Sequence, residues 1–228
     1  PQLRLRRSDV LSAWRGWRPL AKDPNAPPGA AVSRDHVVST DPDTGITFVA
    51  GGKWTTYRQM AEEVVDRVVA QRDPGGSMVL PGPCVTKATK MLGADGFHDN
   101  LAVQLVQEYS IAEDVAANLA FAFGSRARDV CELSGPTGKR WPLRGVRLVD
   151  SYPYIEAEVR YAVKEYARTV EDVVCLRTRL AYLNVAAAGE AIPRVAEIMA
   201  EELGWSAEET LGQIAQAKAA VAEFGGPV

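Results

Sequence analysis

The sequence predicts an α+β fold, in which a β-hairpin and one helix are followed by an all-α helical bundle. Two β-rich runs, residues 35–39 and 46–50, flank the turn-forming cluster Asp41-Pro42-Asp43-Thr44-Gly45, which indicates a hairpin. Three prolines and three glycines between residues 73 and 83 exclude a helix or a central strand in that stretch. From about residue 99 onward, apolar residues recur at helical spacing. We therefore expect a first domain over residues 1–72, a linker over 73–98 and a helical domain over 99–228.

Composition and charge exclude several classes of protein. Apolar residues make up 46% of the 228 residues and charged residues 24%, which is typical of a globular chain. The net charge of −3 argues against a protein whose whole surface binds nucleic acid and leaves a local basic patch open. Cys84, Cys131 and Cys175 are far apart and form no CxxC, so we expect neither a disulfide framework nor a metal site. Because the chain starts at Pro1 and not at an initiator Met, we expect it to be part of a longer protein.

Within the first domain, Gly51-Gly52 ends the second β-rich run, and a helix is expected from a Thr55 or Thr56 cap to about Gln71. In the second domain we expect helices over residues 100–109 and 155–166, a third after a capping box at 110–113, and a fourth that starts at 169–172. A fifth should span about 190–203, with Pro193 in its first turn, and Ser206 should cap the last.

The junction Gly51-Gly52-Lys53-Trp54-Thr55 favours an anion. Two glycines allow close backbone approach, and the unsatisfied N–H groups of a helix start carry partial positive charge beside the Lys53 ammonium group. The alternative is a tight turn with a surface lysine.

Arg18, Arg34 and Lys53 belong to the same short segment and could converge on a phosphate or carboxylate. The alternative is a strand with solvated charges. A further alternative, single-stranded nucleic acid on the N-terminal arginines around Trp14 and Trp17, conflicts with the acidic remainder of the chain. His36 and His98 have no spacing that suggests a metal site or a catalytic triad.

Charged residues of the helical part lie on opposite faces, for example Arg160 and Lys164 against Glu156 and Glu165. We expect salt bridges to account for most of them. The alternative is a cationic surface that faces a membrane or a partner domain.

Three motifs together resemble one enzyme family, the FAD-dependent glycerol-3-phosphate dehydrogenases of the mitochondrial type. They are Ala13-Trp-Arg-Gly-Trp-Arg18-Pro-Leu20, Ser33-Arg34-Asp35-His36-Val37 and Ala50-Gly-Gly-Lys53-Trp-Thr-Thr-Tyr-Arg58. A second group resembles the helical C-terminal domain of the same family: Gly138-Lys-Arg-Trp-Pro142, Tyr154-Ile-Glu-Ala-Glu158, Lys164-Glu-Tyr-Ala167 and Arg177-Thr-Arg-Leu-Ala-Tyr-Leu-Asn184. The resemblance covers nearly the whole chain to about Leu203 and implies that residues 1–72 are the C-terminal remnant of an FAD-binding and substrate domain.

The resemblance implies oxidation of glycerol 3-phosphate to dihydroxyacetone phosphate, with electrons passed through FAD to membrane quinone. Arg18, Arg34 and Lys53 would bind the substrate, and Arg18 would be a catalytic residue. Gly51, Gly52, Lys53, Trp54 and Thr55 would contact the pyrimidine end of the flavin, where negative charge develops. A peripheral position on the mitochondrial inner membrane is implied, with the bacterial cytoplasmic membrane as the alternative; a homodimer is left open.

Two parts of the family pattern are absent from this sequence. It contains no GxGxxG fingerprint for the ADP half of FAD and no credible general base, so we expect the chain alone neither to hold FAD tightly nor to turn over substrate. No calcium-binding loop is present, so calcium regulation is unsupported. Two alternatives remain open: an oxidase of the same family, and a non-enzymatic helical interaction module with a vestigial pocket.

Overall fold

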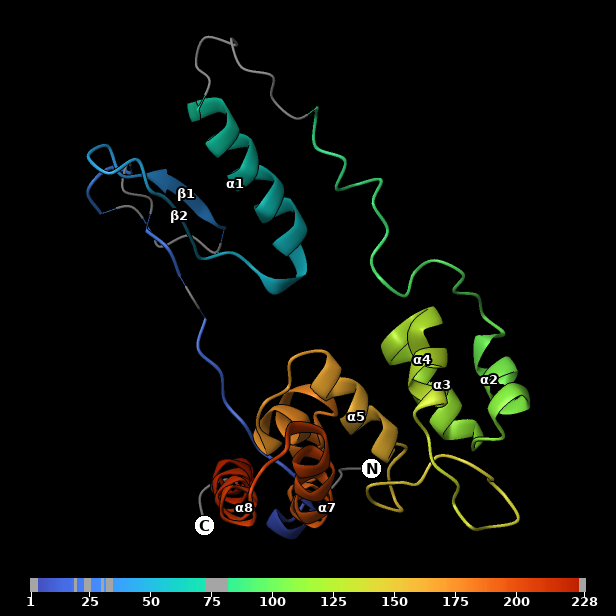
Figure 1. Cartoon of the computed structure of the whole chain (residues 1–228). Coiled ribbons are helices and arrows are strands. Elements are labelled where there is room, and N and C mark those ends of the chain that lie inside the picture. Colours follow the sequence, from blue (N-terminus) through green and yellow to red (C-terminus); the bar gives the residue numbers. More distant parts are fainter. Residues whose placement is uncertain are drawn as a thin grey trace. The chain divides into compact units, whose positions relative to one another are not determined.

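The computed structural model describes residues 4–18, 20–22, 26–29, 31, 35–72 and 82–225. These residues form two compact units. One contains residues 16–90, and the other contains the N-terminal residues up to Arg15 together with the chain from Met91 onward. The first holds a hairpin and a helix and the second is helical (Figure 1), so the predicted α+β fold class is confirmed.

The hairpin lies where the sequence predicts it. Strands β1 (Val37–Thr40) and β2 (Thr47–Ala50) are antiparallel, with Val37 opposite Ala50 and Thr40 opposite Thr47. In the turn between them, Asp41 Oδ1 accepts hydrogen bonds from the backbone N–H of Thr44 at 2.8 Å and of Asp43 at 3.1 Å, and from the Thr44 hydroxyl at 2.8 Å. The Thr44 hydroxyl is the main reason that the pKa of Asp41 falls below its usual value. This side chain therefore fixes the turn as an Asx-type turn.

Helix α1 (Tyr57–Arg72) is held to the hairpin through polar side chains. Arg67 Nη1 donates to the carbonyl of Val38 at 2.8 Å, and Gln71 Nε2 donates to the hydroxyl of Thr40 at 2.5 Å. No residue of α1 is buried, and Ala21 is the only buried residue that the structure describes between residues 16 and 90. Apolar burial within this chain therefore contributes little to the stability of this unit.

The helical unit has two apolar cores that share one helix. Helices α2 (Leu101–Tyr109), α3 (Glu113–Phe123) and α4 (Ala127–Glu132) enclose the first core. Helices α7 (Val185–Leu203) and α8 (Ala207–Ala222) enclose the second together with a π-helix, Asp172–Arg177, and the short α6 (Leu180–Leu183). Helix α5 (Glu156–Lys164) places Ala157 and Tyr161 in the first core and Val159 and Ala162 in the second. It is therefore the element that joins the two halves of this unit.

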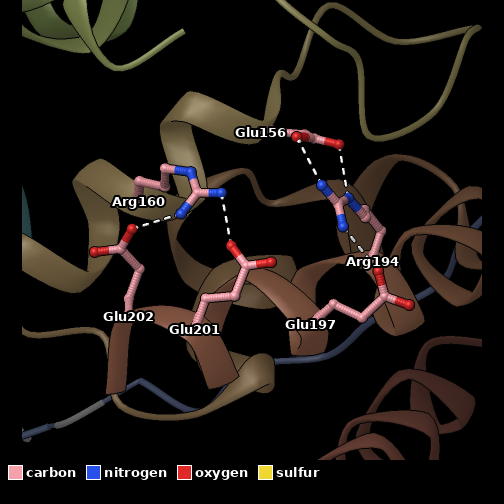
Figure 2. A network of polar contacts seen from close by, with 6 residues as sticks. All are labelled: Glu156, Arg160, Arg194, Glu197, Glu201 and Glu202. Atoms are coloured by element: carbon pink, nitrogen blue, oxygen red, sulfur yellow. Dashed lines mark hydrogen bonds and ion pairs between the residues drawn. The ribbon is translucent and has the colours of Figure 1, made fainter. Parts of the chain in front are cut away.

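Ion pairs connect α5 to α7 (Figure 2). The Arg160 guanidinium contacts Glu201 at 2.8 Å and Glu202 at 2.6 Å, near the C-terminal end of α7. Arg194 of α7 donates to both carboxylate oxygens of Glu156, at 2.7 and 3.1 Å. These contacts agree with the expectation that the charges of the helical part form salt bridges.

Several helix boundaries differ from the sequence prediction. Ser110 has a left-handed backbone (φ +55°) and does not cap α3, so the predicted capping box at residues 110–113 is wrong. The helix expected from residue 169 is a π-helix followed by α6, and α4 was not predicted. Helix α1 starts through a 3-10 turn, Trp54–Thr56, that begins after Lys53, so neither Thr55 nor Thr56 caps it.

Helix α7 starts at Val185, five residues before the predicted start. Asn184 caps it, with its side-chain oxygen accepting from the backbone N–H of Ala186 at 3.0 Å and of Ala187 at 3.2 Å. Pro193 therefore lies inside the helix and not in its first turn. The Ser206 cap of α8 is confirmed, because its hydroxyl accepts from the Glu209 N–H at 3.1 Å.

The N-terminal segment packs on the helical unit. The Ser12 hydroxyl donates to the carbonyl of Ala181 at 2.7 Å, the Ala13 N–H donates to the carbonyl of Phe224 at 2.8 Å, and the Trp14 ring contacts Tyr182 edge-on. The expected division into domains at residues 1–72, 73–98 and 99–228 stays a prediction for the longer protein. The two compact units described above reflect only contacts within this chain. Residues 73–81 of the expected linker lie outside the described residues.

Candidate anion-binding site at a strand–helix junction

Gly51 and Gly52 lie between β2 and the 3-10 turn. The backbone conformation and the close neighbours at both positions require glycine. Both have left-handed φ angles, +77° and +81°. A Cβ atom on Gly51 would lie 2.9 Å from Ala21 Cβ and 3.0 Å from the carbonyl oxygen of Asp35. A Cβ on Gly52 would lie 2.7 Å from the sulfur of Met60. No other residue type fits here without strain.

The helix start that follows these glycines carries free donors. Within the part of the chain that the structure describes, the backbone N–H groups of Trp54 and Thr55 have no acceptor, whereas that of Thr56 donates to the carbonyl of Lys53 at 3.1 Å. The Lys53 side chain is exposed, and among the described residues it forms no ion pair. Unpaired N–H groups and an ammonium group at one helix start attract an anion.

A pocket of about 170 Å³ lies at this junction. It is lined by Asp35, His36, Gly52, Lys53, Thr56 and Gln59. Beside it, the Glu63 carboxylate accepts from Gln59 at 2.8 Å and bonds to His36 Nε2 at 2.5 Å. These contacts, that of Gln59 first, lower the pKa of Glu63. The Glu63 carboxylate is thus already engaged, and among the described residues that line this pocket Lys53 is the cation that remains for a ligand.

The structure brings five of the seven predicted site residues together at one junction; the other two, Arg18 and Arg34, do not belong to it in sequence. Residues 51–55 form one continuous junction, in which the Trp54 ring is 90% exposed. Arg18 is exposed and lies three residues before Ala21, the residue that packs against Gly51, but it does not line the pocket. Arg34 lies outside the described residues. The convergence of Arg18, Arg34 and Lys53 on one ligand therefore stays a prediction.

Sequence reasoning missed His36, Thr56 and Gln59 as pocket residues. The register of the hairpin could have indicated His36. Val37 lies opposite Ala50, so His36, which precedes Val37, lies beside Gly51 and Gly52, which follow Ala50. Thr56 follows Lys53 by three residues and Gln59 follows Thr56 by three, and residues three apart in a helix lie near the same face. No group of three or more His, Cys, Asp or Glu among the described residues could hold a metal ion. In the same residues, no helix is both long and apolar enough to span a membrane.

Comparisons with known proteins agree with this organisation. Residues 84–210 match the family model described as the C-terminal domain of alpha-glycerophosphate oxidase. The mitochondrial glycerol-3-phosphate dehydrogenase of Mesocricetus auratus is 46% identical over 202 residues, which are 89% of this chain and 27% of that protein. The human protein of the same name is 46% identical over 201 residues, and a probable one from Caenorhabditis elegans is 45% identical over 214.

A solved structure shows the same fold. The glycerol-3-phosphate dehydrogenase from Bacillus halodurans in complex with FAD superposes with a TM-score of 0.70 at 25% identity, over 99% of this chain and 42% of that one. The chain thus spans less than half of this structure and about a quarter of the length of the curated relatives.

The fold and these matches define the class first: the chain is similar to the C-terminal part of proteins named glycerol-3-phosphate dehydrogenase and to the C-terminal domain of alpha-glycerophosphate oxidase. More particularly, the chain belongs to the family of the C-terminal domain of alpha-glycerophosphate oxidase, and the resemblance to the mitochondrial-type, FAD-dependent glycerol-3-phosphate dehydrogenases is confirmed.

Proposed function

We propose that the chain is the C-terminal part of an FAD-dependent sn-glycerol-3-phosphate dehydrogenase that oxidises glycerol 3-phosphate to dihydroxyacetone phosphate and passes electrons to quinone. The observation that carries this is the strand–Gly51-Gly52–Lys53–helix junction, whose first N–H groups and ammonium group have no partner among the described residues, in a chain 46% identical to a mitochondrial glycerol-3-phosphate dehydrogenase. The relatives are named mitochondrial, which supports a mitochondrial location. Peripheral attachment to the inner membrane and a homodimer are parts of the same proposal.

Lys53, Arg18 and Arg34 hold the substrate in this proposal. Glycerol 3-phosphate is a small dianion with a hydroxyl group at the reacting carbon. A lysine supplies a point charge, and arginines supply paired planar donors that match a phosphate. Arg18 additionally holds the reacting oxygen and is the catalytic residue that this chain provides. The exposure of Arg18 and Lys53 in this chain fits a site that is completed by the rest of the enzyme.

The junction fits part of FAD. Among the described residues, the N–H groups of Trp54 and Thr55 have no acceptor, which suits the pyrimidine end of a flavin ring, and Gly51 and Gly52 let the backbone approach it. When bound, FAD supplies the acceptor for the hydride from the substrate. No residues for the ADP half are present in the sequence, so this chain contributes one wall of the cofactor site.

The family description keeps one alternative open. Since the matching family model is described by an oxidase, electron transfer to oxygen is the second candidate function. Oxygen consumption by the full-length enzyme with glycerol 3-phosphate distinguishes the two: turnover that needs quinone supports the dehydrogenase, and turnover with oxygen alone supports the oxidase.

Substitution of Lys53 tests the proposal. In the full-length enzyme we expect Lys53→Ala to lower kcat/KM for glycerol 3-phosphate about a hundredfold, because a charged donor to the substrate is lost. Lys87→Ala is the matched control, an exposed lysine of the same unit outside the pocket, and should stay within about twofold of wild type. An unchanged kcat/KM in Lys53→Ala would contradict the proposal and favour an interaction module with a vestigial pocket.

A further inference from the structure

Residues 11–14, which we call the anchor segment, bind backbone groups at the ends of two helices of the helical unit. The Leu11 carbonyl accepts from the N–H of Val185, the first residue of α7, at 3.0 Å. The Ser12 hydroxyl donates to the carbonyl of Ala181 in α6 at 2.7 Å. The first N–H groups and the last carbonyl groups of a helix have no partner within that helix. The anchor segment therefore supplies partners that α6 and α7 lack.

Aromatic rings hold the other end of the anchor segment. The Ala13 N–H donates to the carbonyl of Phe224, which follows α8, at 2.8 Å. The Trp14 and Tyr182 rings meet edge-on with their centroids 5.5 Å apart, and the Tyr182 and Phe224 rings do so at 4.8 Å. Edge-on ring pairs at such distances are favourable. Tyr182 is therefore the central ring of this attachment.

The anchor segment is not part of the apolar interior of the helical unit. None of its four residues, all of which the structure describes, belongs to either apolar core. Leu11 is 57% exposed and Trp14 is 65% exposed. Apolar burial therefore gives little reason for this attachment, although four consecutive residues take part in it.

The residues that follow the anchor segment suggest what the attachment is for. Arg18 comes four residues after Trp14, so the Cα atoms of these two residues are at most about 14 Å apart. Three residues after Arg18, Ala21 packs against Gly51. Arg18 itself is exposed, so the contacts on either side of it in sequence restrict where its side chain can lie.

We propose that Tyr182 is a positioning residue for Arg18. By holding Trp14, the Tyr182 ring limits the conformations of the segment that carries Arg18 and keeps the guanidinium group near the geometry in which it binds glycerol 3-phosphate. A shift of about 1 Å in a group that holds substrate can lower a rate about a hundredfold. This role rests on the proposed function, in which Arg18 binds the substrate, and it gives the helical unit a part in that binding.

A double-mutant cycle in the full-length enzyme tests this role. We expect Tyr182→Ala to lower kcat/KM for glycerol 3-phosphate about tenfold and Arg18→Ala to lower it about a hundredfold. Because Tyr182 acts through Arg18, the double variant should stay within about twofold of Arg18→Ala alone. Tyr182→Phe, which keeps the ring contact, should stay within about twofold of wild type. The KM for the electron acceptor and the flavin content should not change in Tyr182→Ala, whereas a general loss of structure would alter both.

Hydrogen exchange measured by mass spectrometry tests the anchor without relying on activity. In full-length Tyr182→Ala, a peptide that covers residues 11–18 should exchange faster than in wild type, because the hydrogen bond of the Ala13 N–H opens more often. Ser12→Ala removes one hydrogen bond and no packing, so it should fold normally, lower kcat/KM about threefold and show the same coupling to Arg18→Ala. Tyr166→Ala is the matched control, an exposed tyrosine of the same unit whose ring contacts Arg168, and should change neither the exchange nor kcat/KM.

The outcomes separate this role from the proposed function. Losses that simply add in the double variants, or an unchanged kcat/KM in both Tyr182→Ala and Ser12→Ala, would overturn the positioning role and leave Arg18 as a substrate-binding residue. Unchanged exchange of residues 11–18 in Tyr182→Ala would also overturn it. An unchanged kcat/KM in Arg18→Ala would show instead that Arg18 does not bind the substrate, and the proposed function would lose that residue together with this role.

Discussion

Glu158 shows at the scale of one residue how burial changes chemistry. Its carboxyl group is buried in the first turn of α5, with one backbone and one side-chain donor. Desolvation dominates over these hydrogen bonds, and the pKa of Glu158 rises from 4.5 to about 8. The sequence contains this residue within a matched family motif, but nothing in the sequence shows that it is buried.

This raised pKa makes stability depend on pH. Between about pH 4.5 and pH 8 the unfolded chain has released the Glu158 proton and the folded chain keeps it, so the folded state binds more protons and the free energy of unfolding falls as pH rises. We expect Glu158→Gln, which cannot ionise, to gain about 2–4 kcal/mol relative to wild type between pH 5 and pH 8. Urea unfolding of both proteins at the two pH values measures the difference.

An exposed carboxylate serves as the control for this titration. Glu190→Gln, on the surface of α7, should follow the wild-type pH dependence. If the free energies of unfolding of wild type and Glu158→Gln change in parallel between pH 5 and pH 8, Glu158 is not the cause of the pH dependence.

Gly51 and Gly52 were predicted as a place of close approach to a ligand, and the structure adds a second reason for them. Their left-handed φ angles were within reach of sequence reasoning, because a Gly-Gly pair between a strand and a helix commonly marks such a turn. Their contacts with Ala21 and Met60 were not, because these depend on how the chain returns to the hairpin. The glycines are therefore explained by packing even before any ligand is considered.

At the scale of elements, hydrophobic periodicity located most helices but not all their ends. Helix α1 ends at Arg72, one residue beyond the prediction, because its pattern is long and regular. Helix α7 starts early because Asn184 provides a cap, and this earlier start leaves Pro193 inside the helix and not in its first turn. The π-helix after residue 171 has no sequence signature that periodicity detects.

The junction between α5 and α7 rests partly on charge. We expect Arg160→Met to lower the free energy of unfolding by about 0.5–1 kcal/mol at low salt, because the half-exposed pairs with Glu201 and Glu202 are lost and the two acids then repel each other. The apolar stem of methionine retains packing, which isolates the contribution of charge. Urea unfolding with and without 1 M NaCl measures it, and about 1 M salt should reduce the difference.

Arg140→Met is the control for this charge effect, since Arg140 is exposed and forms no ion pair among the described residues. Equal losses in both variants, or a difference that persists in high salt, would rule out the ion pairs as the cause.

At the scale of the whole molecule, the two units differ in what stabilises them. The helical unit encloses two apolar cores, whereas Ala21 is the one buried residue described in the hairpin unit. The hairpin and α1 are instead joined by exposed hydrogen bonds such as Arg67 to Val38, which contribute little net stability. A two-stranded hairpin with so little burial is marginal in water.

We therefore expect the 228-residue chain alone to protect its helical unit and to leave the hairpin unit open. In hydrogen exchange measured by mass spectrometry, peptides from α5 and α7 should exchange slowly, and peptides from residues 35–72 should exchange within the shortest labelling time. The purified chain should also retain no flavin, as judged by its visible absorbance. Slow exchange in the hairpin or bound flavin would contradict this expectation.

The sequence by itself determined the α+β class, the hairpin at Asp41–Gly45, the helical second part and the junction of Gly51, Gly52 and Lys53. These follow from local chemistry, namely turn residues, alternation, helical periodicity and glycine conformation, and from motifs that resemble a family. Only the tertiary structure decided that the N-terminal segment packs on the helices, that His36 lies at the Lys53 pocket and that Glu158 and Tyr161 share a pocket in the helical unit. Burial, and with it the loss of water around a charge or a hydroxyl, depends on neighbours distant in sequence, and no local pattern records them.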